Sequence, residues 1–195
     1  MSGRHGDAAR PGAAVFIGAA RDCAPFLPRA LERWDALATC FECAHFIVAE
    51  NDSTDGTKAI LGAWAAAGRN RTLLTLDGIE ADQIRTVRLA AVRNRLLEEV
   101  RSREDLRRAS YLVVMDLDYA SLLITPARLR RSLALERWDG LFANQLFYYY
   151  DVWALRDERR SPDDWVERVS AAPPGWRRAW ARLRHLEWRG RPFWP

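Results

Sequence analysis

Residues 45–57 have the sequence His-Phe-Ile-Val-Ala-Glu-Asn-Asp-Ser-Thr-Asp-Gly-Thr. The first five residues are mostly apolar, and a polar loop follows them. Ser53 and Thr54 are residue types that begin helices, because their hydroxyls accept hydrogen bonds from the free N–H groups of the first turn. The following residues, to about residue 67, carry apolar side chains at helical spacing. The stretch therefore predicts a buried strand over His45–Ala49, a short loop and an amphipathic helix.

The same alternation of apolar runs and helical patterns extends over most of the chain. The other expected strands are Ala13–Ala19, Thr72–Leu76, Tyr111–Met115 and Gly140–Ala143. The other expected helices cover about residues 22–37, with Asp22 as the cap, 81–101 and 126–135. Strands that alternate with helices form βαβ units and a largely parallel sheet, and continuously apolar strands are covered on both faces. We therefore expect an α/β fold, a Rossmann-like αβα sandwich with a mostly parallel central sheet.

Polar residues follow the end of each expected strand. They are Arg21, then Glu50, Asn51 and Asp52, then Asp77, then Asp116 and Asp118, and finally Asn144 and Gln145. In open α/β sheets the ligand lies beyond the carboxyl ends of the strands. The predicted site is therefore rich in carboxylates.

Asp116 and Asp118 are the sharpest signal in the sequence. Two carboxylates one residue apart, just after a buried strand, repel each other unless a cation lies between them. Mg²⁺ or Mn²⁺ is the cation that such a pair holds, usually shared with substrate phosphates. The alternative is structural, in which Asp116 caps the following turn and Asp118 is solvated.

Glu50 and Asp52 are a second candidate pair. Helix capping accounts for Ser53, Thr54 and Asp55 without any ligand. It does not account for Glu50 or Asp52. A carboxylate at a strand end can accept hydrogen bonds from a nucleobase imide or a ribose hydroxyl, so these two residues are candidate nucleoside ligands.

Four motifs together carry a resemblance to a known family. IVAENDSTDGT (47–57) is followed by AAVRN (90–94), VVMDLD (113–118) and an aromatic-rich stretch over residues 148–156. In this order and spacing they resemble the nucleotide-diphospho-sugar transferases of GT-A fold, and most closely the bacterial and fungal relatives of the cryptococcal capsule mannosyltransferase family. The resemblance covers roughly residues 13–157.

The resemblance implies metal-dependent transfer of a sugar from a nucleotide-diphospho-sugar donor to a glycan or lipid-linked acceptor, with Mn²⁺ or Mg²⁺ as cofactor. It implies nucleotide-binding roles for Arg21, Glu50, Asp52, Arg88, Arg93, Asn94 and Asp116, and metal-binding roles for Asp116 and Asp118. A cation and arginines would neutralise the charge that develops on the leaving nucleoside diphosphate. The alternative for Arg88 and Arg93 is a solvated helix face.

The chain departs from the family after residue 157. Family members continue with further strands, whereas the segment Gly175–Pro195 has no counterpart there, so we expect a C-terminally truncated transferase. Asp151 is the best remaining carboxylate for the general base, and an aromatic-flanked structural turn is its alternative role. Two other functions stay open: an inactive nucleotide- or metal-binding remnant, and a glycoside hydrolase. The hydrolase is disfavoured because Asp116 and Asp118, on one turn, are poorly placed to flank a bond at about 5–10 Å from each other.

Charge separates the tail from the body. Residues 168–195 contain seven Arg and one acid, Glu187, for a net charge of +6, which leaves −2 of the total +4 to residues 1–167. We expect a flexible segment 1–12, a nucleotide-sugar-binding domain 13–158 and a basic Trp/Arg-rich tail 159–195 that is helical in part. The tail can contact an anionic membrane surface or pack its Trp face on the sheet. Nucleic acid is not an expected partner, since the body is net negative.

Composition points to a cytoplasmic protein. No apolar run approaches the roughly 18 residues of a membrane span, and the polar segment before Pro11 lacks the apolar region of a signal peptide. We therefore expect a cytoplasmic protein, with peripheral membrane contact through the tail left open. Cys40 and Cys43 form a single CxxC without a second ligand pair, so three reduced thiols are expected instead of a zinc site.

Overall fold

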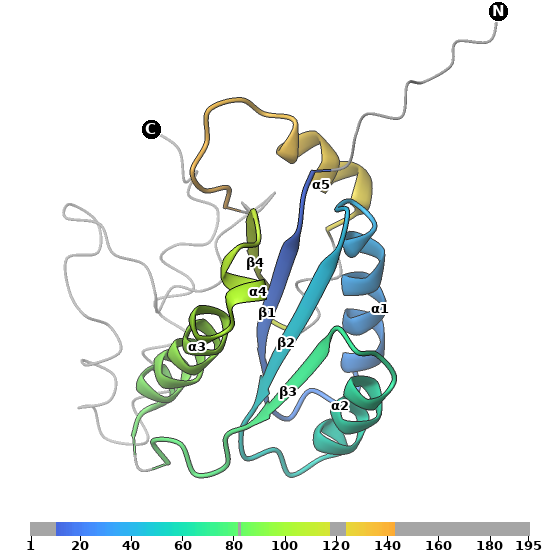
Figure 1. The fold of residues 1–195 in the computed structure, drawn as a ribbon. Coiled ribbons are helices and arrows are strands. Elements are labelled where there is room, and N and C mark those ends of the chain that lie inside the picture. The colour runs from blue at the N-terminus through green and yellow to red at the C-terminus, as the bar shows by residue number, and fades with distance from the viewer. Residues whose placement is uncertain (1–10, 82, 118–123, 143–195) are drawn as a thin grey trace, which may run out of the picture. The chain divides into compact units, whose positions relative to one another are not determined.

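The structure, a computed structural model, describes residues 11–81, 83–117 and 124–142. The chain divides between Arg137 and Trp138 into two units, which we consider separately. The first unit contains a four-stranded sheet in which every strand pair is parallel (Figure 1). The strands, in the spatial order β3-β2-β1-β4, are β1 (Ala14–Ala20), β2 (Ala44–Glu50), β3 (Arg71–Thr75) and β4 (Tyr111–Val114). The helices are α1 (Leu27–Ala38), α2 (Thr57–Ala66), α3 (Arg85–Ser102), α4 (Glu104–Arg107) and α5 (Pro126–Leu133).

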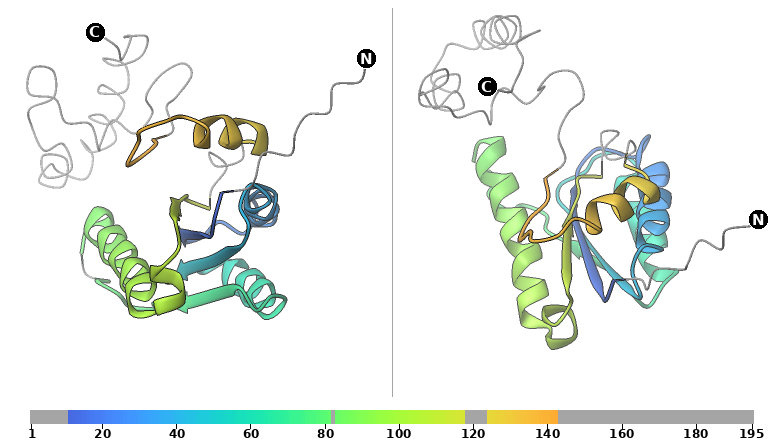
Figure 2. Two further views of the ribbon diagram at one scale, coloured as in Figure 1. Left: turned by 45° about the horizontal axis from the view of Figure 1, so that its top comes forward. Right: turned by 90° about the horizontal axis from the view of Figure 1, so that it is seen from above.

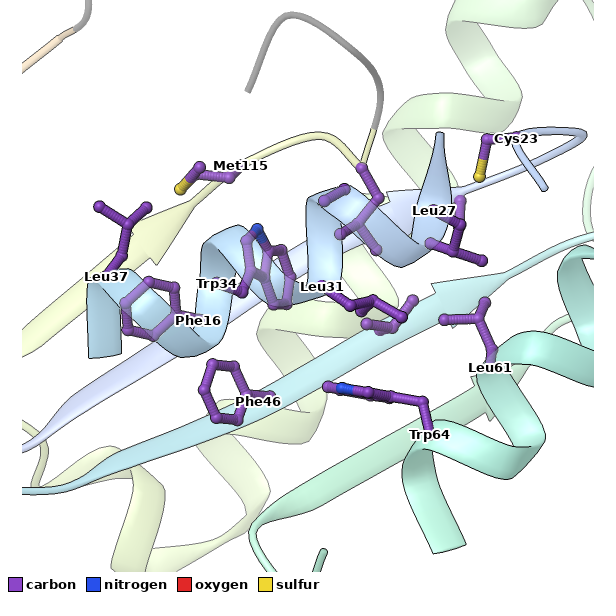
Figure 3. Packing of buried hydrophobic residues seen from close by; sticks show 14 of the residues in the cluster. Phe16, Cys23, Leu27, Leu31, Trp34, Leu37, Phe46, Leu61, Trp64 and Met115 are labelled. Carbon is purple, nitrogen blue, oxygen red and sulfur yellow. The ribbon is translucent and has the colours of Figure 1, made fainter. Parts of the chain in front are cut away.

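Helices cover both faces of this sheet, and the core accordingly has two parts. Successive side chains of a strand point to opposite faces. On one face, Phe16 and Phe46 pack against Trp34 of α1 and Trp64 of α2 (Figure 3). On the other face the residues that alternate with them pack against α3 and α4. This second cluster contains Val15, Ile17, Ile47, Ala49, Val92, Leu96 and Leu106. The two layers of helix are seen on opposite sides of the sheet in Figure 2.

The predicted fold class is thus confirmed: the described residues form an α/β fold with a Rossmann-like αβα arrangement and an all-parallel sheet. The two central strands, β1 and β2, are buried along most of their length because helices lie on both faces. This explains why their apolar runs do not alternate with polar residues. The two outer strands are less covered: β3 contains Arg71, Thr72 and Thr75, and Leu112 and Val114 of β4 are exposed.

The order in which the chain adds strands to the sheet reverses at β1: β2 and β3 lie on one side of β1, and β4 lies on the other. The connections from β1 to β2 and from β2 to β3 run through α1 and α2 on one face, and the connection from β3 to β4 runs through α3 and α4 on the other. Since β4 pairs with β1, the two opposite crossovers diverge between these strands. Ligands of open α/β sheets bind at such a switch point, so the region beyond the ends of β1 and β4 is the expected place for a site.

Two predicted helix caps are wrong. Helix α1 begins at Leu27, with Pro28 in its first turn, and not at Asp22. Helix α2 begins at Thr57, after Gly56 and without a side-chain cap, so Ser53 and Thr54 lie in the preceding loop. The polar side chains that a sequence offers as caps are used here to join one loop to another, as described below.

The predicted strand over Gly140–Ala143 is also wrong for the residues that the structure describes. Gly140, Leu141 and Phe142 belong to no strand. Only two of the four residues are large and apolar, and Gly and Ala contribute little to strand formation. Ala143, like Asp118, Asn144, Gln145, Asp151, the boundary at residue 158 and the whole basic tail, lies outside the described residues.

Two further findings concern the chain as a whole. None of the described helices combines the length and the apolar character that crossing a membrane requires. The three cysteines form no disulfide within the described part of the chain: Cys23 and Cys40 are buried, whereas Cys43 is exposed.

Candidate functional site

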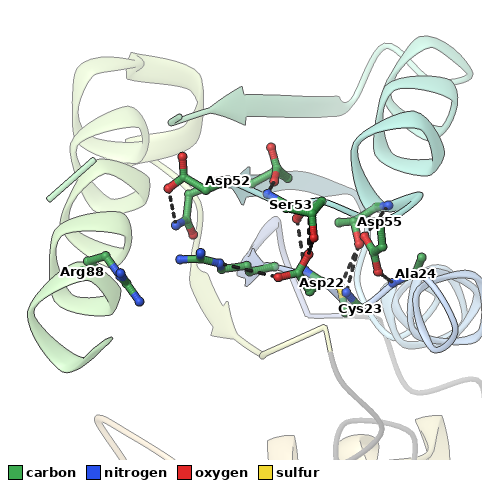
Figure 4. Close-up of polar contacts among 12 residues, drawn as sticks. Asp22, Cys23, Ala24, Asp52, Ser53, Asp55 and Arg88 are labelled. Carbon is green, nitrogen blue, oxygen red and sulfur yellow. Dashed lines mark hydrogen bonds and ion pairs between the residues drawn. The ribbon is translucent and has the colours of Figure 1, made fainter. Parts of the chain in front are cut away.

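Two carboxylates join the loop after β1 to the loop after β2. Asp22 Oδ1 accepts a hydrogen bond from the Thr54 backbone N–H at 2.8 Å, and Asp55 Oδ2 accepts one from the Ala24 N–H at 3.0 Å. Asp22 is also a donor: its backbone N–H donates to Ser53 Oγ at 3.1 Å (Figure 4). Asp22 has a φ of 46°, in the left-handed region that Asp tolerates better than most residues. The two loops are thereby fixed to each other at the carboxyl edge of the sheet.

A buried threonine completes this junction. Thr57 is fully buried, and its Oγ1 accepts a hydrogen bond from the Cys23 N–H at 2.9 Å. Its own N–H donates to Asp55 Oδ1 at 2.9 Å. Hydrogen bonds from the Thr57 side chain and backbone lower the pKa of Asp55, so this carboxylate stays ionised as an acceptor. The loop at the start of α2 is therefore held in one conformation by its own polar side chains.

Asp52 forms a reciprocal clamp with the loop after β3. Its backbone N–H donates to Asp77 Oδ1 at 3.0 Å, and its Oδ1 accepts from the Gly78 N–H at 2.7 Å. The amide of Asn51 donates to Asp52 Oδ2 at 3.3 Å. The Gly78 N–H first, and the Asn51 amide second, lower the pKa of Asp52. Oδ1 of Asp52 thus joins the two loops, Oδ2 accepts only from the neighbouring Asn51, and the predicted role of Asp52 toward a ribose depends on the lone pairs that remain.

Lys58, the one lysine in the sequence, lies between the carboxylates of Asp77 and Glu50. Its Nζ lies 2.7 Å from Asp77 Oδ1 and 4.0 Å from Glu50 Oε2. The hydrogen bond to Asp77 is the main reason that the pKa of Lys58 is raised, and it is also the main reason that the pKa of Asp77 is lowered. Lys58 therefore neutralises part of the negative charge at the ends of β2 and β3.

Glu50 is buried, with 1% of its surface exposed. Its Oε1 accepts a hydrogen bond from the Ser53 N–H at 2.8 Å, and its Oε2 has no hydrogen-bond partner among the described residues. As the last residue of β2 it shares a face with Phe46 and Val48, the face covered by α1 and α2. In this structure Glu50 organises the loop, and its predicted role in base recognition stays a prediction.

The clamp around Asp77 makes stability depend on pH. Because the pKa of Asp77 is lower in the folded protein, the ionised side chain adds to the free energy of unfolding. This contribution is present above the ordinary pKa of about 3.9 and is lost as the pH falls through the pKa of the folded protein. The pKa of Lys58 is raised, so its contribution to the free energy of unfolding is lost only as the pH rises through its pKa in the folded protein, above about 10.4.

We expect Asp77→Asn to lower the free energy of unfolding by a constant amount between about pH 5 and 9, and the difference from the parent to shrink below about pH 4. Urea unfolding across this range measures it. The exposed Glu42 lies outside these loops, so Glu42→Gln is the control; a difference for Asp77→Asn that persists unchanged at the lowest pH contradicts the assignment.

Asp116 lies at the other end of the site, directly after β4. Both of its carboxylate oxygens face one nitrogen of Arg93 on α3: Nη2 lies 3.1 Å from Oδ1 and 3.2 Å from Oδ2. Both residues border a half-open and almost wholly apolar pocket of about 120 Å³ at the ends of β1 and β4. The remaining lining residues are Ile17, Gly18, Ala19, Leu96, Leu97 and Val114. The pair therefore lies at the switch point of the sheet, on the face covered by α3.

The three polar residues predicted on α3 do not converge. At about 100° of rotation per residue, Arg88 and Arg93 are about 140° apart around the helix, and Asn94 lies about 100° beyond Arg93. Arg93 reaches Asp116, whereas Arg88 donates to the Ala81 carbonyl at 3.3 Å and extends from α3 toward the loop cluster in Figure 4. Asn94 is exposed. Arg21, after β1, places its Nε 3.8 Å from Asp22 Oδ2.

Asp116 has the chemistry that a hard divalent cation requires. It is a carboxylate, its side chain is 50% exposed, and a positive charge already lies against it. Within residues 11–81, 83–117 and 124–142 no group of three or more His, Cys, Asp or Glu side chains is placed to hold a metal ion. Mg²⁺, however, commonly uses only one or two carboxylates and takes its other ligands from phosphates and water. Asp116 fits such a site, and its predicted partner Asp118 is not described.

The sequence placed Asp77 at the rim of the predicted site without a role, and it did not place Asp22 or Lys58 there. Their positions carried a signal nonetheless, because each follows a strand end or lies within the first turn of the next helix. Lys58 is also the one departure from arginine among the cations of the chain.

Comparison of the chain with protein-family models gives no match, and comparison with the curated proteins gives none either. The function must therefore be inferred from the fold and the side chains themselves.

Proposed function

We propose that this protein is a glycosyltransferase that binds a nucleotide-diphospho-sugar together with Mn²⁺ or Mg²⁺ and transfers the sugar to a glycan or lipid-linked acceptor. The observation that carries the proposal is the pairing of Asp116 with Arg93 at the switch point of the sheet. A carboxylate for a cation and a guanidinium for phosphate lie there side by side. Mg²⁺ sites in proteins typically combine a carboxylate with substrate phosphates.

The loops at the same edge supply the nucleoside side of the proposed site. The junction of Asp22 with Thr54 and the clamp of Asp52 with Gly78 hold the loops after β1, β2 and β3 in place before a ligand arrives. A preorganised site loses less entropy on binding. Carboxylates such as Asp52 accept hydrogen bonds from ribose hydroxyls with the lone pairs that the clamp leaves available.

Arginines account for the transfer step in this proposal. When the bond between the sugar and the diphosphate breaks, negative charge grows on the leaving diphosphate, and donors placed beforehand around it stabilise that charge. Arg93, on α3, and Arg21, after β1, are arginines at this edge of the sheet, and each guanidinium is a fixed positive charge with several donors. Arg88 lies about 140° around α3 from Arg93 and donates to the Ala81 carbonyl. A divalent cation on Asp116, when bound, would supply further neutralisation of the same charge.

A nucleotide-binding module without transfer activity is the second candidate. One observation favours it. Every candidate residue within the described part of the chain has a proposed role toward the nucleotide-sugar donor, whereas the one proposed base, Asp151, lies outside the described residues. Consumption of a nucleotide sugar in the presence of acceptors separates the two candidates, because a binding module holds the nucleotide and releases no sugar.

The proposal predicts stabilisation by a nucleoside diphosphate only when a divalent cation is present. At 100 times its dissociation constant a ligand adds about 2.7 kcal/mol, which for a chain of this size corresponds to roughly 5–10 °C in Tm. A thermal-shift panel of UDP, GDP, ADP and CDP, each with Mn²⁺ or with EDTA, measures this. The matching nucleosides, which lack phosphates, serve as controls for the cation dependence. A panel in which no diphosphate raises the Tm with Mn²⁺, or in which EDTA makes no difference, contradicts the proposal.

A further inference from the structure

Arg93 occupies the position on Asp116 that a cation would take. One nitrogen, Nη2, lies nearly equidistant from both carboxylate oxygens, at 3.1 and 3.2 Å. The arrangement is not the two-nitrogen, two-oxygen fork that gives arginine–carboxylate pairs their strength. It places a single positive centre between the two oxygens, as a bound metal ion does when a carboxylate holds it with both oxygens.

We infer that Arg93 is an internal counter-ion, which holds Asp116 in the ligand-free protein and must leave it before a divalent cation binds there. This inference rests on the proposed function, because it takes Asp116 as a cation ligand. It adds a competition between two positive charges for one carboxylate. Binding of the cation then releases Arg93 beside it, where its guanidinium is available to the diphosphate.

The pair is suited to exchange and not to a fixed structural role. The side chains of Arg93 and Asp116 are 45% and 50% exposed, and ion pairs that water reaches to this extent contribute little to stability. The same exposure leaves room on the solvent side of the pair for Arg93 to change rotamer. The neighbouring residues Val92 and Leu96 are buried in the core, so α3 itself stays in place while the side chain moves.

Competition predicts two effects of opposite sign for one substitution. In Arg93→Gln, Asp116 has no internal cation, and the repulsion between arginine and metal is absent, so Mn²⁺ without nucleotide should bind about threefold to tenfold more tightly. The same variant lacks the guanidinium that meets the diphosphate, so UDP or GDP, whichever the parent binds, should bind about fivefold to tenfold more weakly in saturating Mn²⁺. Arg93→Lys keeps the charge and should bind Mn²⁺ as the parent does.

The control is another arginine on the same helix. Arg95 pairs with Glu98 on the exposed surface of α3, so Arg95→Gln makes the same change in net charge two residues away. It should leave both affinities unchanged. Mn²⁺ without nucleotide is measured by electron paramagnetic resonance of the free ion, and the nucleoside diphosphate by calorimetry in saturating Mn²⁺. Circular dichroism of each variant confirms that it is folded.

The outcomes separate this inference from the proposed function. Opposite shifts in Arg93→Gln that are absent in Arg95→Gln, together with Mn²⁺ binding by Arg93→Lys that equals the parent's, support the inference. If Arg93→Gln binds Mn²⁺ as the parent does while Asp116→Asn abolishes that binding, the competition is wrong and Asp116 remains a metal ligand. If neither the parent nor Arg93→Gln binds Mn²⁺ without nucleotide, the inference fails, and the proposed function fails with it if EDTA also makes no difference to the binding of the nucleoside diphosphate.

Discussion

Asp116→Asn is expected to weaken the cation-dependent binding of a nucleoside diphosphate by about 10- to 100-fold, the range that corresponds to the loss of one charge-assisted interaction. The substitution keeps the size of the side chain and removes its negative charge. An amide oxygen is a weaker ligand for a hard cation than a carboxylate. Calorimetric titration of the nucleoside diphosphate in the presence of Mn²⁺ measures the effect.

A matched control for this variant is Asp105→Asn. Asp105 also pairs with an arginine, Arg103, at 3.0 Å, but it lies at the start of α4, next to the opposite end of β4. The control thus loses an exposed ion pair and one negative charge, as Asp116→Asn does, without touching the proposed site. Equal affinities in the parent and Asp116→Asn would remove the basis for the metal role. A similar loss in both variants would instead show that the effect comes from net charge.

The architecture was predictable because each step of it depends on local pattern. The strand expected over His45–Ala49 is β2, Ala44–Glu50, and the helix expected over residues 81–101 is α3, Arg85–Ser102. Each expected strand in the described core lies within one residue of its observed bounds, because each coincides with a short run of mostly apolar residues. The helix starts were less predictable, because Asp22 and Thr54 form hydrogen bonds to each other's loops, 32 residues apart, and not to their own helices.

The sequence was sufficient to predict the edge of the sheet that carries the candidate residues, but not the face of the sheet on which each of them lies. Any residue after a parallel strand lies at the carboxyl edge, so the sequence places Glu50 and Asp116 together there. The register of the strands then separates them. Glu50 faces α2, where Lys58 lies 4.0 Å away, and Asp116 faces α3, where it meets Arg93. A ligand that contacts both must therefore lie across the end of the sheet, an arrangement that only the three-dimensional pairing of strands reveals.

Gly18→Ala is expected to destabilise the fold by about 2–3 kcal/mol, the cost of overpacking a core position, which corresponds to a fall in Tm of roughly 4–12 °C. A Cβ on Gly18 would lie 2.3 Å from the Met115 carbonyl oxygen and 2.8 Å from the ring of Trp34. Neither neighbour can move easily. Met115 is joined to β1 by the hydrogen bond from its N–H to the Ile17 carbonyl at 3.0 Å, and Trp34 is fully buried between Phe16 and Phe46.

The glycine at this position therefore sets how closely β1 approaches the segment that carries Asp116. Relief of the clash requires Met115 to move, and Asp116 moves with it, so Gly18→Ala should also weaken cation-dependent nucleotide binding. Gly62→Ala is the control, because a Cβ on Gly62 in α2 meets nothing within 4 Å. Replacement of a helical glycine by alanine stabilises by about 0.5–1 kcal/mol, so the two variants should shift urea unfolding in opposite directions. A Gly18→Ala protein that unfolds like the parent would show that β1 and Met115 have room to separate, and the position of Asp116 would then depend on Arg93 and not on the close approach of the two backbones.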